Sequence, residues 1–219
     1  MALNLKTMTK KELRPYLQAY RPLFEGWTEV GGEGFLRISG PVAQQVWFER
    51  LSGGAYRPAT AVSVLVAKHS GMLFSFLDYP LREVFPRDHD SKSERVCKAM
   101  REQFVPSIAS PLNAIEVCHF CEKSAIDTIP DAHTLVALNA YLGRLASAQK
   151  FLDIFRRLTH NGKDLPDYFE ERFRAVNAIQ EALQRGNVKE VLDEVRHSEQ
   201  CRLLKDARQP PIPTGIDKC

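Results

Sequence analysis

Apolar positions follow two different periods along the chain, and the change of period marks its organisation. Between residues 13 and 20, apolar side chains recur at steps of three and four, which predicts a helix with one apolar face. Thr9 and Glu12 have the spacing of a capping box, in which each side chain binds the other residue's backbone N–H. The pattern predicts a helix that begins after Thr9 and ends before Pro22.

Between residues 27 and 77 the apolar positions form short runs, which are typical of strands. They predict an antiparallel sheet of three or four strands, at residues 35–39, 42–51, 60–66 and 72–77. Gly40-Pro41 and Ser52-Gly53-Gly54 separate the first three runs, and such short connections favour antiparallel pairing. Nearly every residue of 60–66 is apolar, which predicts a strand at the centre of the sheet with both faces covered.

From residue 91 nearly to the end of the chain, the apolar period is that of helices. The sequence therefore predicts an α+β fold, in which an N-terminal helix and an antiparallel sheet pack with a C-terminal helical region. We expect residues 1–90 and 91–205 to form one composite domain, because a small sheet needs a cover, with two separate domains as the alternative. Residues 206–219 are rich in proline and predict a flexible tail.

Composition and charge exclude several classes of protein. Of the 219 residues 44% are hydrophobic and 26% charged, which excludes a disordered polymer, a collagen and a coiled-coil rod. The formal net charge of +3 is too small to require a nucleic-acid partner. We expect no membrane span, because no apolar run approaches about 20 residues. We expect no secretory leader, because the N-terminus has no continuous apolar run and no small-residue cleavage site. Five scattered cysteines fit free thiols, and the expected location is the cytoplasm.

Two patterns resemble known groups of proteins. Tyr141-Leu142-Gly143-Arg144 is similar to the Leu-Gly pair of tetratricopeptide helical hairpins, although Gln149 stands where that family has a small residue, and no second copy follows. A first helix, a meander containing Gly34-Phe35-Leu36-Arg37 and Gln44-Gln45-Val46-Trp47-Phe48-Glu49, and a helical tail look like small bacterial α+β domains of unknown function. Some proteins of that type are immunity or accessory proteins, so this resemblance implies protein binding.

Cys118-His119-Phe120-Cys121 is the first candidate site. Two thiolates at this spacing can hold one zinc ion, with His119 beside them. A structural zinc site needs four ligands, and the sequence contains no second close pair of cysteines or histidines. The preferred interpretation is that Cys118 and Cys121 face the core as small apolar side chains, and no cofactor is expected.

Asp88-His89-Asp90 is the second candidate site. Carboxylates beside an imidazole can bind a divalent metal ion or act as acid and base. These residues stand in a predicted polar loop at 79–91, where Asp90 or Ser91 is also suited to cap the next helix. A solvated loop is the simpler interpretation. A metal-dependent hydrolase or nuclease that uses this loop or the Cys118 region is the alternative.

Basic residues along or beside one predicted helix are the third candidate: Arg144, Lys150, Arg156, Arg157 and Lys163. At helical spacing some of them share a face, which an acidic protein surface would complement. Nucleic-acid binding through the same face is a further alternative. We hypothesise a non-enzymatic cytoplasmic protein that binds another protein, with toxin neutralisation or an accessory role as the most concrete form. Self-association into a homo-oligomer stays open.

Overall fold

The computed structural model describes residues 6–68, 70, 73–123, 128–162 and 166–205. Its strands are β1 (Thr28–Val30), β2 (Gly34–Ser39), β3 (Val42–Arg50), β4 (Tyr56–Val64) and β5 (Leu73–Phe76). Its α-helices are α1 (Lys10–Tyr20), α2 (His89–Gln103), α3 (Ala114–Lys123), α4 (Ile129–Tyr141), α5 (Leu145–Leu158), α6 (Asp167–Arg185) and α7 (Val188–Leu204). Short 3₁₀ helices cover Arg21–Phe24, Pro86–Asp88 and His160–Gly162.

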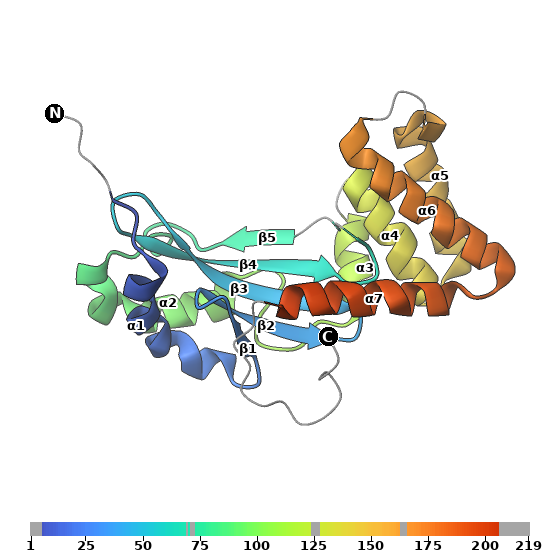
Figure 1. Cartoon of the computed structure of the whole chain (residues 1–219). Coiled ribbons are helices and arrows are strands. Elements are labelled where there is room, and N and C mark those ends of the chain that lie inside the picture. The colour runs from blue at the N-terminus through green and yellow to red at the C-terminus, as the bar shows by residue number, and fades with distance from the viewer. Residues whose placement is uncertain (1–5, 69, 71–72, 124–127, 163–165, 206–219) are drawn as a thin grey trace.

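Figure 1 shows the sheet in the middle of the molecule, with α1 and α2 at one end and α3, α4, α5 and α6 grouped at the other. Helix α7 leaves this group and runs back along the sheet. The N-terminal helix, the antiparallel sheet and the helical C-terminal region confirm the predicted α+β fold.

Helix α1 begins where the capping box places it. Glu12 N donates to Thr9 Oγ1 at 3.2 Å, and Thr9 N donates to Glu12 Oε2 at 2.7 Å. The predicted box is therefore confirmed, and it satisfies backbone N–H groups that the first turn leaves without helical partners. Leu13, Leu17 and Tyr20 form the apolar face and are buried against the sheet.

The strands follow one another in space in sequence order, and every pair is antiparallel. Four of them, β2, β3, β4 and β5, correspond to the predicted runs. The sheet has one strand more than predicted, because β1 is three residues long and too short to show alternation. Strand β4 lies beside the edge strand β5 rather than at the centre, and eight of its nine residues are buried.

The sheet is covered on both faces, and alternate residues of one strand therefore reach different apolar clusters. Phe35 packs under α1 and α2, whereas its neighbour Leu36 packs with Leu204 at the end of α7. At the end of the sheet, Val62 joins a larger cluster with Leu135 and other helical residues. Burial of these side chains supplies most of the favourable free energy of folding.

The helix after the sheet begins earlier than predicted. Pro86 opens a 3₁₀ helix that runs directly into α2, so Asp88, His89 and Asp90 do not lie in a solvated loop. Asp88 occupies the N-cap position and Asp90 and Ser91 lie within the first turn, which corrects the prediction that Asp90 or Ser91 caps this helix. Proline favours this start because its fixed φ suits the first turn of a helix.

Four other predictions have different outcomes. The division into residues 1–90 and 91–205 stays a prediction, and the predicted tail at 206–219 lies outside the described residues. In the part of the chain that the structure describes, no helix has the length and apolar character that crossing a bilayer requires.

Cys97, Cys118 and Cys121 are free thiols, but Cys201 is disulfide-bonded, so the expectation of free cysteines is wrong at that position.

Candidate functional site

A cleft of about 510 Å³ lies where four segments meet: the start of α1, the turn between β1 and β2, the end of β3, and the end of α7. It is lined by Thr7, Lys10, Val30, Gly31, Glu33, Gly34, Trp47, Phe48, Glu49, Arg50 and Leu203. Charged side chains and apolar ones therefore face the same space.

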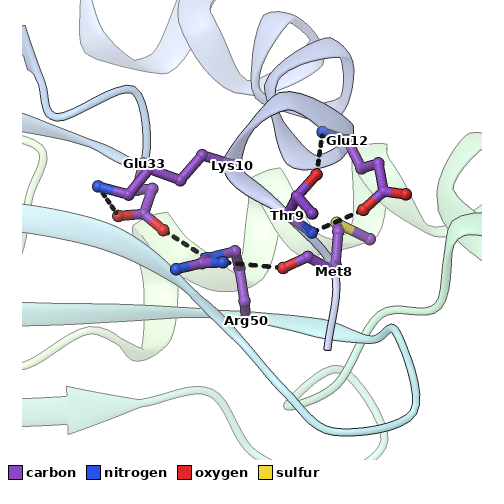
Figure 2. Close-up of polar contacts among 6 residues, drawn as sticks. All are labelled: Met8, Thr9, Lys10, Glu12, Glu33 and Arg50. Carbon is purple, nitrogen blue, oxygen red and sulfur yellow. Dashed lines mark hydrogen bonds and ion pairs between the residues drawn. The ribbon is translucent and has the colours of Figure 1, made fainter. Parts of the chain in front are cut away.

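Figure 2 shows the charged groups at one wall of this cleft. The Glu33 carboxylate lies 2.8 Å from Lys10 Nζ and 2.5 Å from Arg50 Nε. Arg50 Nη1 also donates to the Met8 carbonyl oxygen at 2.9 Å, which ties the segment before α1 to β3. Two cations thus share one carboxylate, and the group of three side chains keeps a net positive charge.

The turn between β1 and β2 places Glu33. Gly31 and Gly32 have φ of 60° and 67°, a left-handed conformation that glycine adopts without a steric penalty. Phe48 N then donates to the Glu33 carbonyl oxygen at 2.8 Å, which holds this turn against β3. The Glu33 side chain is consequently held within reach of Arg50.

The segment that forms one edge of the cleft is positively charged. Residues 6–14 contain Lys6, Lys10, Lys11 and Arg14 against one carboxylate, that of Glu12. Lys6 pairs with Glu12 at 3.7 Å and Lys10 pairs with Glu33. For Lys11 and Arg14 the structure shows no ion pair with any residue it describes. The edge therefore presents positive charge that the chain itself does not neutralise.

This arrangement can bind an anionic group next to an apolar one. Ion pairs that are partly exposed contribute little free energy, so Lys10 can exchange Glu33 for a carboxylate of a bound molecule at small cost. Trp47 and Leu203 supply apolar surface in the same cleft. Its described lining contains no cysteine or histidine, and its one hydroxyl is that of Thr7.

This cleft was not predicted from the sequence. Glu33 lies in the turn between β1 and β2 and Arg50 ends β3, and no motif connects either residue to α1. One signal was available: Lys10 and Lys11 stand in the first turn of a helix, where the helix dipole disfavours positive charge. Cations at such a position indicate either a carboxylate from elsewhere in the fold or a bound anion.

The residues of the Asp88-His89-Asp90 candidate have separate neighbours. Asp88 Oδ2 pairs with Lys92 Nζ at 3.0 Å. His89 is buried and its Nδ1 lies 2.6 Å from the Tyr56 hydroxyl, whereas Asp90 is exposed. Each side chain thus has a local structural role or faces solvent, and a catalytic role for the three stays a prediction.

His89 belongs to a buried polar network that sequence analysis missed. The Tyr20 and Tyr56 hydroxyls are 2.8 Å apart, and Tyr56 bonds to His89, so the network joins α1, β4 and α2. Burial raises the pKa of Tyr20 to about 12, raises that of Tyr56 well above its usual value, and lowers that of His89. Nδ1 of the neutral imidazole therefore accepts a hydrogen bond from the Tyr56 hydroxyl, which stays protonated at neutral pH.

We expect acidification to destabilise the protein partly through His89. Because burial lowers the pKa of His89 below 6.5, the unfolded chain binds a proton at higher pH than the folded chain does. Neutral His89 contributes its full stability at pH values above the pKa that His89 has in the unfolded chain. This contribution is lost as pH falls from that value toward the lower pKa of His89 in the folded chain. The measurement is urea unfolding of the wild type and of His89→Gln at about pH 7.5 and about pH 5.5.

The His89→Gln variant should lose less free energy of unfolding between the two pH values than the wild type does. His119→Gln is the matched control, because His119 is an exposed imidazole on α3. An equal loss in all three proteins would show that His89 does not carry this pH dependence.

The cysteine candidate lies on α3. Cys118 is buried in the core and Cys121 is partly buried, whereas His119 is exposed. Burial raises the pKa of each thiol to about 11, so both stay protonated at neutral pH and are weak metal ligands and nucleophiles. The Arg144 guanidinium opposes this rise in the pKa of Cys118 only in part. Among described residues, no group of three acidic, histidine or cysteine side chains is placed to hold a metal ion.

The other basic residues of the third candidate differ in exposure. Lys150 and Arg157 are exposed on one face of α5, about two helical turns apart. Arg156 is turned toward α6, where its Nη2 donates to Asn177 Oδ1 at 3.3 Å. Lys163 lies outside the described residues. Two of the five residues therefore share an exposed face, and a partner for that face stays a prediction.

The geometry above defines an α+β protein with a positively edged cleft beside its sheet. No protein family, curated protein or solved structure matches the chain.

Proposed function

We propose that this is a non-enzymatic binding protein, and that an acidic segment of a partner protein occupies the cleft at the start of α1. The observation that carries the proposal is the excess of positive charge on residues 6–14, whose Lys10 lines this cleft together with Arg50, Glu33 and Glu49. Lys11 and Arg14, which have no ion pair among the described residues, would attract and orient the partner's carboxylates. A toxin-neutralising or accessory role is the most concrete form of this proposal.

The cleft also offers the apolar anchor that a stable complex needs. Binding free energy concentrates in a few central side chains, among which tryptophan and arginine are frequent. Trp47 and Arg50 line the cleft together, and Leu203 adds apolar surface from α7. A segment that places an apolar side chain on Trp47 and carboxylates toward Lys10 would match both chemistries.

We expect the double variant Lys10→Glu with Lys11→Glu to bind the partner about tenfold more weakly or worse, because like charges then face the acidic segment. The partner is first captured from a lysate of the source cells with the full chain, and its Kd is then measured for wild type and variant. Wild-type binding should weaken as salt rises, since the attracting charges are exposed.

Lys150→Glu with Arg157→Glu is the matched control, because it reverses two exposed charges on α5. This control should bind as the wild type does, and unchanged melting temperatures establish that both variants fold. Equal binding by the α1 variant would refute the cleft as the site, and a loss confined to the α5 variant would move the site there. Loss of capture after nuclease treatment would identify nucleic acid as the ligand instead.

A further inference from the structure

A second hollow, separate from the cleft, lies between α6, α7 and the chain just beyond β4. It has a volume of about 250 Å³. Its apolar lining comes from Val66, Ala175, Ala178, Ile179, Val191, Leu192 and Val195. Lys68, Glu171 and Arg174 also line it, and His133 of α4 contributes a ring that is 1% exposed. Apolar side chains thus surround the space, with charged groups added by α6 and the segment beyond β4.

The side chains of α6 account for this space. Ala175 and Ala178 face the hollow where longer apolar residues would fill it. Ala178 is exposed and Ala175 is partly exposed, so the hollow opens to solvent. A ligand that covers these apolar walls removes their surface from water, which is favourable. The hollow is therefore better suited to an apolar ligand than to water.

Size and lining indicate an aromatic ligand. An apolar cavity of about 150 Å³ accommodates one benzene ring, so this larger space suits two fused rings or one substituted ring. The His133 ring is almost fully covered by protein, so only its edge can meet a ligand ring, in the edge-to-face contact that aromatic pairs favour. Phe155 lies behind it, with ring centroids 6.5 Å apart.

The charged lining favours an anionic group on that ligand. Lys68 and Arg174 are two cations against the single carboxylate of Glu171. Lys68 Nζ lies 3.7 Å from Glu171 Oε1, and Arg174 Nη2 lies 3.9 Å from Glu170 Oε2. The side chains of all four residues are substantially exposed. Such pairs contribute little free energy, so a ligand carboxylate can displace them.

We propose that this hollow binds a small aromatic carboxylate, with its ring between α6 and α7 and its carboxylate at Lys68. The site does not depend on the cleft at α1, and either proposal can fail without the other.

The test uses the full chain and 2-naphthoate, with calorimetric titration at up to about 1 mM ligand. Saturable binding of one ligand is expected. Ala175→Leu places a larger side chain in the hollow and should weaken binding about tenfold or more. Ala146→Leu, which makes the same change at an exposed position of α5, should leave binding unchanged. Absence of saturable binding to the wild type, or full binding to Ala175→Leu, would overturn the proposal.

Two further comparisons examine the carboxylate and the ring. Lys68→Gln should weaken 2-naphthoate about fivefold while leaving the neutral 2-naphthalenemethanol unchanged; equal effects on both would refute the role of Lys68. Hexanoate should bind more weakly than 2-naphthoate, and tighter binding would refute an aromatic ligand.

If Ala175→Leu fails to fold, hydrogen exchange of the wild type, measured with and without 2-naphthoate, tests the location of the site instead. Protection by 2-naphthoate should be confined to α4, α6, α7 and the chain beyond β4, and protection elsewhere would overturn the site.

Discussion

Replacing Gly34 with alanine will destabilise the folded protein by about 3 kcal/mol. Gly34 is paired with Trp47 in the ladder between β2 and β3. A β-carbon at position 34 would lie 2.9 Å from Trp47 Cα and closer still to the Val46 carbonyl oxygen. Both are backbone atoms of the central strand, so they cannot move aside without breaking the pairing of β2 with β3.

Urea unfolding of the wild type, Gly34→Ala and Ser39→Ala measures this effect. Ser39 is the last residue of the same strand and is partly exposed, so Ser39→Ala controls for the introduction of alanine into β2. Gly34→Ala should lower the midpoint strongly and Ser39→Ala only slightly. Similar midpoints for Gly34→Ala and the wild type would show that the ladder can accept a side chain at this position.

Replacing Gln44 with leucine will cost about 3 kcal/mol of stability, because it leaves several buried polar groups without partners. Gln44 Oε1 accepts from Arg37 Nε at 3.0 Å and from Leu112 N at 3.1 Å, and Gln44 Nε2 donates to the Ser107 carbonyl oxygen at 3.1 Å. One side chain on β3 thereby holds the connection between α2 and α3 against the sheet. Leucine is similar in size but makes none of these hydrogen bonds.

Gln45→Leu is the matched control for this prediction. Gln45 is the next residue of β3, points to the opposite face, and is partly exposed. Its replacement should cost less than about 1 kcal/mol. Thermal and urea unfolding of the two variants should therefore differ clearly. Equal losses would mean that the hydrogen bonds of Gln44 contribute no more than its packing.

Several elements were predictable because short-range forces determine them. The capping box of Thr9 and Glu12 acts within one turn, and the strand runs show alternation within a few residues. The start of α2 and the strand β1 were missed for related reasons. A 3₁₀ turn at Pro86 extends α2 toward the sheet, and β1 owes its strand conformation to pairing with β2 rather than to its own pattern.

The candidate sites were less predictable than the fold. Asp88, His89 and Asp90 are adjacent in sequence, yet the fold gives each a different neighbour, and His89 pairs with Tyr56 far along the chain. The cleft at α1 joins Lys10 to Glu33 and includes Leu203 from the end of α7. Only the unfavourable position of Lys10 in the first helical turn pointed to it in advance.

The sequence by itself determined the α+β class, most helices and strands, and the antiparallel pairing, since periodicity, caps and short turns act over a few neighbouring residues. Tertiary structure alone decided which side chains meet: the shared carboxylate of Glu33, the buried pairing of Tyr56 with His89, and the hollow beside Ala175. These contacts depend on how whole elements pack, and packing is set by many weak interactions between residues that are distant in the chain.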